Sequence, residues 1–155
     1  GARTGFRGSK IPGTFRASSS VRTNTTGESV TIFRDEINKY KQGISQEDLD
    51  FTKNALIKSN ARRFETQFAL LGMLQEMSIY GLDQDYIAAE EATVRNMTLD
   101  AHKALANKYL DTSKMAYLVV GDAQSQYTQF RDMGFDEVLL LDKEGEEVKL
   151  ENVKQ

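Results

Sequence analysis

The sequence predicts an α+β fold, a two-layer sandwich in which a block of helices packs on one face of a mostly antiparallel sheet. Three observations predict it. Residues 14–22 show the period-two pattern of a strand, residues 26–110 carry apolar side chains at helical intervals, and two short apolar runs follow. With 155 residues, the chain is long enough for one domain with its own core.

The first expected element is a β-hairpin. Residues 2–8 (ARTGFRG) indicate a strand, residues 9–13, with the only proline, indicate a turn, and residues 13–23 indicate a second strand. In the second strand, Phe15 and Ala17 fall on one face, whereas Arg16, Ser18 and Arg22 fall on the other. Because an isolated hairpin is only marginally stable, we expect it to pair with further strands.

Four or five helices are expected next. Thr25 and Glu28 have the spacing of a capping box before a helix over residues 26–41. The other expected helices start after Ser45 or cover residues 65–80, 84–96 and 99–110. The expected N-caps are Ser45, Asp83 and Thr98, and the glycines expected to end helices are Gly43 and Gly81. The helix after Ser45 has its apolar positions at Leu49, Leu56, Ile57 and Phe64.

The helix over residues 65–80 is the most apolar. Its stripe of Phe68, Leu71, Leu74 and Met77 is widened by further apolar neighbours. A stripe of this width predicts a helix that is buried on more than one side.

The sequence of residues 115–145 predicts a strand, a helix and a second strand. Residues 115–120 (MAYLVV) form a continuous apolar run, which favours a buried strand. A short helix over residues 123–133 should stop at Gly134, and residues 137–142 (EVLLLD) should form the last strand before a turn at 143–145.

Charge is unevenly spread along the chain. The net charge is −3, yet residues 1–23 carry five basic side chains and no acidic one, which leaves a net −8 on the remaining residues. These basic residues are either a solvated strand face or a surface for an acidic partner or peptide. We expect no nucleic-acid partner, because the basic residues lack an aromatic stacking series and the rest of the chain would repel phosphate.

Few residues here suit catalysis. The chain has no cysteine and a single histidine, His102, so it cannot build a thiolate site or a histidine-based zinc site alone. His102 has no acidic or histidine neighbour at metal-ligand spacing on its helix, which indicates a structural role, at the surface or half-buried. Asp122 follows a predicted strand, where α/β enzymes often place catalytic groups, but no glycine-rich phosphate loop accompanies it. No apolar run approaches 18 residues, so no membrane span is expected.

Taken in order, several stretches resemble a known family. GARTGFRG, GTFRASSSVRTNTTGESV, ISQEDLDFTKNALI, RRFETQFALLGMLQEMSIYGLDQDYI, MTLDAHKALANKYLD and AYLVVGD resemble the second, non-catalytic domain of the insulinase/pitrilysin family of zinc metallopeptidases. Mitochondrial processing peptidase and the core subunits of respiratory complex III belong to the same superfamily. The resemblance covers residues 2–122.

The resemblance implies a function. In that family an inverted His-x-x-Glu-His motif in a catalytic domain binds zinc, and this sequence has no such motif. The chain is therefore expected to be the non-catalytic half of a peptidase, without its own cofactor, that helps a separate zinc domain enclose an extended peptide. Residues 1–122 would form the body of this domain without its N-terminal portion, and residues 123–155 a helix–strand extension of it.

The candidate substrate-binding residues are the hairpin arginines Arg3, Arg7, Arg16 and Arg22. The family's non-catalytic half often supplies an Arg and a Tyr near the metal, but these precede the stretch matching residues 1–8, so Arg3 and Arg7 do not take that role. The compartment stays open, although the lack of cysteine and the family precedent favour a bacterial cell envelope. Two alternatives remain: a structural core-type subunit without peptidase activity, and a small α/β enzyme using Asp122.

Overall fold

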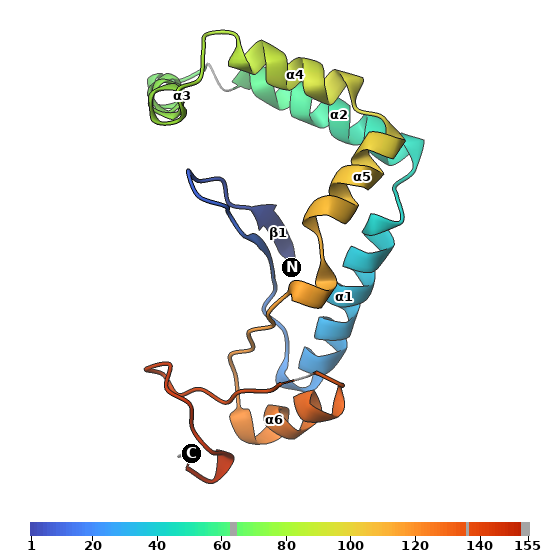
Figure 1. Cartoon of the computed structure of the whole chain (residues 1–155), viewed down its shortest axis with the longest axis vertical. Helices are drawn as coiled ribbons and strands as arrows, with labels where there is room; N and C mark the ends of the chain where they lie inside the picture. The colour runs from blue at the N-terminus through green and yellow to red at the C-terminus, as the bar shows by residue number, and fades with distance from the viewer. Residues whose placement is uncertain (63–64, 136, 153–155) are drawn as a thin grey trace. The chain divides into compact units, whose positions relative to one another are not determined.

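The computed structural model describes residues 1–62, 65–135 and 137–152, and Phe64 lies outside them. The described residues contain helices and a two-stranded antiparallel sheet, which confirms the α+β class (Figure 1). In chain order the elements are β1 (Arg3–Phe6), β2 (Phe15–Ser18), η1 (Thr23–Thr25), α1 (Thr26–Lys41), α2 (Gln46–Ala61), α3 (Gln67–Tyr80), α4 (Tyr86–Asn96), α5 (Leu99–Tyr109), η3 (Thr112–Lys114), α6 (Ala123–Asp132) and η4 (Leu150–Asn152). The labels η mark short 3-10 helices.

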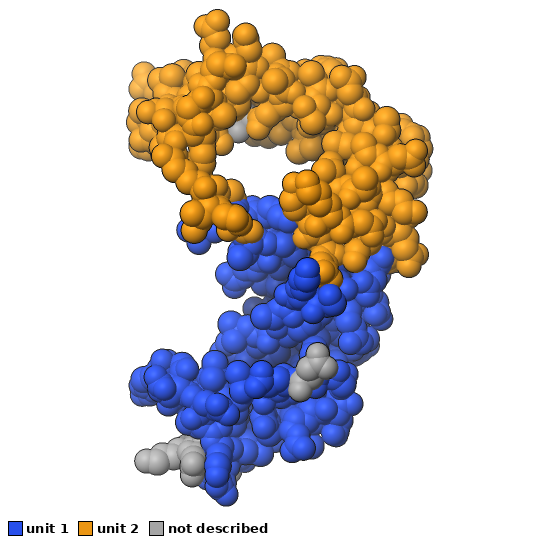
Figure 2. Space-filling model, viewed as in Figure 1, with its two compact units in different colours: residues 1–7, 14–38, 112–155 blue, residues 8–13, 39–111 orange. Residues whose placement is uncertain are grey.

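The chain divides into two compact units (Figure 2). Unit 1 comprises residues 1–7, 14–38 and 112–155, and unit 2 comprises residues 8–13 and 39–111. Each unit has its own small set of buried side chains, so each is described by itself.

In unit 1, α6 lies against the first turn of α1. The Gln126 side-chain amide donates a hydrogen bond to the Thr23 carbonyl over 2.8 Å, and Phe130 is buried. Gly27 is also buried, and a Cβ built there would lie 2.7 Å from the Gln129 side-chain nitrogen. A side chain at position 27 would therefore have to displace the end of the flexible Gln129 side chain.

In unit 2, α2 and α4 lie side by side (Figure 1). Leu49 on α2 is 4% exposed, and the Lys53 ammonium donates to the Met97 carbonyl after α4 over 2.8 Å. Among the described residues of this unit, Ala106 on α5 and Leu110 at its C-terminal end are the other buried apolar residues. Hydrophobic contact and one hydrogen bond to a carbonyl thus position these helices.

Several predicted helix ends are confirmed. The Ser45 hydroxyl accepts from the Asp48 backbone N–H over 3.1 Å in a capping box, and the Thr98 hydroxyl accepts from the Ala101 backbone N–H at the start of α5. Gly81 ends α3 with φ +66°, a left-handed conformation that glycine adopts without steric cost. The Thr25 capping box is not formed, because the Thr25 hydroxyl donates to the Arg22 carbonyl instead and η1 precedes α1.

Two predicted strands are wrong. Residues 115–120 form no strand, and Leu118 and Val120 are 85% and 91% exposed. Residues 137–142 contribute only an isolated antiparallel bridge from Leu141 to Glu147, around the predicted turn that Gly145 makes with φ +88°. A strand requires a paired neighbour, and in the described residues these apolar runs have none along most of their length.

The burial predicted for α3 is also wrong. None of its described residues is buried, and Phe68 is 87% exposed. The apolar stripe is present as predicted, but in the described residues no other element packs closely enough on α3 to cover it. Apolar composition alone therefore does not bury this helix.

Candidate functional site

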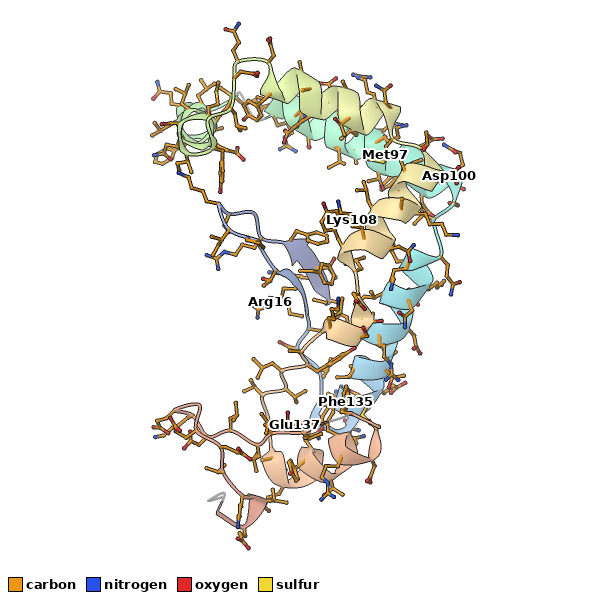
Figure 3. All side chains as sticks on the ribbon, in the orientation of Figure 1. Arg16, Met97, Asp100, Lys108, Phe135 and Glu137 are labelled. Atoms are coloured by element: carbon orange, nitrogen blue, oxygen red, sulfur yellow. The ribbon has the colours of Figure 1, made fainter. Side chains whose placement is uncertain are left out.

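The β1–β2 ribbon has one basic face. Its register pairs Arg3 with Ser18 and Gly5 with Arg16, and the Arg7 backbone N–H donates to the Thr14 carbonyl over 3.0 Å. Directly opposed residues project their side chains to the same face of an antiparallel pair, and so do alternate residues of one strand. Arg3, Arg7 and Arg16 therefore share a face, which we call the arginine face; Figure 3 shows Arg16 extending away from the ribbon.

The opposite face of the ribbon is apolar. Phe6 and Phe15 are paired across the strands with their ring centroids 5.1 Å apart. Phe15 and Ala17 are half-buried, whereas the three arginines are exposed. Phe6 is 62% exposed, so contact between the two rings rather than full burial characterises this face. A shift of register by one residue would separate the rings, so their contact favours the register that places the three arginines together.

The arginine face has a regular spacing. Same-face residues of a strand lie about 6.6 Å apart, so Arg3 and Arg7 are separated by about 13 Å along β1. Arg16 lies on the neighbouring strand opposite Gly5, halfway between them. A Cβ built at Gly5 meets no atom within 4 Å, so no side chain of β1 separates the two outer arginines.

The charges of this face are not compensated locally. Among the described residues, no carboxylate forms an ion pair with Arg3, Arg7 or Arg16, whereas Arg95 pairs with Glu91 and Lys143 with Glu144. Arginine is always charged at neutral pH and donates to carboxylates in a planar, bidentate geometry. The face can therefore accept an anionic group without first breaking an ion pair to any of the described carboxylates.

Arg22 does not join this face. It lies beyond the paired residues of β2, it is exposed, and its carbonyl accepts from the Thr25 backbone N–H over 2.9 Å. The structure therefore brings together three of the four arginines that the sequence singled out.

His102 is a half-buried structural histidine, as predicted. Its Nε2 lies 2.6 Å from the Tyr40 hydroxyl, and the two rings meet edge to face with centroids 5.0 Å apart. The Asn107 side-chain amide, further along α5, donates to the Lys41 carbonyl over 2.8 Å. His102 thus helps to join α5 to the end of α1. Sequence reasoning missed this partner, because 62 residues separate Tyr40 and His102.

Asp122 is an N-cap rather than part of a reactive cluster. Its carboxylate accepts from the Gln124 backbone N–H over 3.2 Å at the start of α6. Hydrogen bonding from the Ser125 side chain, and then from the backbone N–H groups of Gln124 and Ser125, lowers the pKa of Asp122 below 3.8 against the opposing effect of desolvation. A nearby open depression is lined by Gln124 and by Lys149, Leu150 and Glu151 near η4, and it does not include Asp122.

The described residues offer neither a metal cluster nor a membrane-spanning helix. Over residues 1–62, 65–135 and 137–152, no three acidic or histidine side chains gather closely enough to hold a metal ion. In the same part of the chain, no helix combines the length and the apolar character needed to cross a bilayer.

Comparison with solved structures finds a similar fold. No family profile and no curated protein matches the sequence. The chain is similar to the crystal structure of a peptidase M16 inactive domain from Pseudomonas fluorescens, with a TM-score of 0.65 and 24% identical residues. The match covers 72% of this chain and 26% of the other, so this chain spans about a quarter of that protein's length. The chain therefore shares the fold of an inactive peptidase domain.

Proposed function

We propose that this chain acts as the non-catalytic half of a zinc-dependent peptidase of the insulinase/pitrilysin type. In this role it helps to enclose and bind an extended peptide beside a separate catalytic domain, on the same chain or on a partner. The observation that carries the proposal is the fold shared with a peptidase inactive domain, over 72% of the chain. The ordered sequence resemblance over residues 2–122 supports the same reading independently of the structure.

The ribbon offers a way to hold an extended peptide. In the described residues, β1 and β2 form a two-stranded sheet without a third strand, so its outer edges present backbone donors and acceptors. An extended peptide can add to such an edge through its backbone, and side-chain contacts then provide selectivity. Arg3, Arg7 and Arg16 are proposed to make those contacts from the arginine face, and Arg22 from beyond the paired residues of β2.

The test is a comparison of binding with turnover. The purified chain is incubated with zinc and a panel of fluorescent extended peptides, and both anisotropy and peptide mass are measured. We expect binding without cleavage. Metal-dependent, chelator-sensitive cleavage by this chain alone would refute the proposal, and so would a failure to bind any extended peptide.

One observation favours a second candidate, a core-type subunit that scaffolds a larger assembly. The exposed apolar side chains of α3, including Phe68 and Leu74, are suited to a permanent protein interface. A scaffold of this kind would form a stable complex with its partner and bind no free peptide, whereas the first candidate binds peptide in the absence of a partner.

A further inference from the structure

We propose that the arginine face selects extended peptide segments that carry carboxylates at alternate positions. This inference rests on the proposed peptide-binding function and specifies its substrate class. It starts from three arginines, Arg3, Arg7 and Arg16, that share one face, are exposed, and form no ion pair with a carboxylate of the described residues.

The spacing of the face matches an extended chain. A peptide lying along the ribbon presents every second side chain to it, at intervals of about 6.6 Å. Arg3 and Arg7 then face the first and third acidic side chains of an acid-x-acid-x-acid segment. Arg16, opposite Gly5, faces the middle one.

The lack of a side chain at Gly5 leaves space for the middle carboxylate of the peptide between Arg3 and Arg7. Any larger residue at position 5 would place its side chain on the arginine face, between Arg3 and Arg7 and directly opposite Arg16. Because no atom lies within 4 Å of the position of a Cβ at Gly5, the gap is open and the Arg16 guanidinium has room to reach a carboxylate there. Arg16 on β2 therefore supplies the positive charge between Arg3 and Arg7 that β1 itself lacks at position 5.

Two other anions fit this face less well. Single-stranded nucleic acids are typically held by aromatic rings on which their bases stack, and the Phe6–Phe15 pair lies on the opposite face of the ribbon. The acidic segment of a second copy, residues 142–147, is folded into a turn in which the Asp142 carboxylate accepts from the Glu144 and Glu146 backbone N–H groups. An extended peptide meets neither restriction.

The experiment compares isomeric peptides. Fluorescein-labelled Glu-Ser-Glu-Thr-Glu-Ser and its isomer Glu-Glu-Glu-Ser-Thr-Ser carry the same charge, and a Gln-Ser-Gln-Thr-Gln-Ser peptide is the neutral analogue. Anisotropy is measured with the full chain at about 50 mM salt, where screening is weak. We expect the alternating acidic peptide to bind more tightly than its isomer, and the neutral peptide to bind weakly but measurably through its backbone.

Variants locate the effect on the ribbon. Arg3→Ala/Arg7→Ala/Arg16→Ala should weaken binding of the alternating peptide by about tenfold or more, as expected for the loss of three exposed charge pairs. Lys143→Ala, which removes a single positive charge elsewhere in unit 1, is the control for each single arginine variant and should leave binding unchanged. Gly5→Thr keeps all three charges and should fold normally, since its Cβ meets nothing, yet it should abolish the preference for the alternating isomer.

The possible failures can be distinguished. Equal affinity for the two acidic isomers, or no effect of the triple variant, would overturn the selectivity proposal. The proposed peptide-binding function would still stand in that case if the neutral peptide binds. Loss of all peptide binding in the unmodified chain would remove both. Tighter, arginine-dependent binding of a single-stranded oligonucleotide, or concentration-dependent self-association through the arginines, would replace the peptide with another occupant and also overturn the proposal.

Discussion

Two helices of unit 2, α2 and α3, differ in a way that reverses the usual relation between apolar content and burial. The charged helix α2 has Leu49 buried and lies beside α4. The apolar helix α3 has a single charged residue, Glu76, and no buried one. Burial in this chain therefore follows the availability of a neighbouring element rather than the hydrophobicity of the helix itself.

The comparison also shows what holds α3 together. Burial of one large apolar side chain contributes about 1.5–3 kcal/mol, and α3 forgoes this contribution at Phe68, Leu71 and Leu74, which are all more than half exposed. Its ends are nevertheless well formed, because Thr66 accepts from the Ala69 backbone N–H over 3.1 Å and Gly81 adopts the left-handed cap. Local signals define the helix, and its apolar surface stays available to a partner.

The largest expected effect concerns a matched pair of leucines. Leu49→Ala should lower the free energy of unfolding by about 3 kcal/mol, since Leu49 is only 4% exposed and its truncation leaves a cavity. Leu74→Ala should change the same free energy by less than about 0.5 kcal/mol, because Leu74 is 57% exposed. Urea denaturation of the two variants measures both. Equal losses of unfolding free energy in the two variants would mean that α3 is as well packed as α2, and would contradict the proposed difference between these helices.

The second expected effect concerns the two N-caps. Ser45→Ala should lower the free energy of unfolding by about 1 kcal/mol, because the cap belongs to a helix packed in unit 2. Thr66→Ala removes a hydrogen bond of the same length, but it should act locally and accelerate amide exchange in α3 with little effect on global unfolding. Hydrogen exchange and denaturant unfolding measure the two effects separately. A smaller loss of global stability in Ser45→Ala than in Thr66→Ala would contradict this account.

The smallest expected effect extends the comparison to a charged cap, that of α6. Because the pKa of Asp122 is lowered in the folded chain, its carboxylate contributes stability that is present above the ordinary value of 3.8 and is lost as the pH falls through the lower folded value. The unmodified chain should therefore melt above Asp122→Asn at about pH 6, and the difference should shrink at about pH 3. A difference in melting temperature that does not change with pH would contradict the assignment.

Sequence reasoning predicted the local features and failed at contacts between distant residues. The hairpin and the ends of the helices at Ser45, Gly81 and Thr98 depend on residues within a few positions, and all are present. The strand at residues 115–120 and the burial of α3 depend on what lies beside them, and neither is formed in the described residues. An apolar run has the same sequence whether or not another strand or helix covers it.

The candidate site shows the same division. Alternation along a strand is enough to predict that the side chains of Arg16 and Phe15 point in opposite directions. That Arg3 and Arg7 share a face with Arg16 depends on the pairing of Gly5 with Arg16, which the turn between the strands sets. The sequence of the turn, with its glycines and Pro12, predicts a reversal of the chain but not the register that follows from it.

The central proposal is that this chain binds peptides without cleaving them. A single titration followed by mass spectrometry tests it most directly. The purified chain is titrated into the alternating acidic peptide in the presence of zinc, and the mass of the peptide is then measured. We predict a saturable rise in anisotropy that depends on Arg3, Arg7 and Arg16, and a peptide of unchanged mass. A shortened peptide whose appearance requires zinc and stops with a chelator, or a flat titration, would contradict the account.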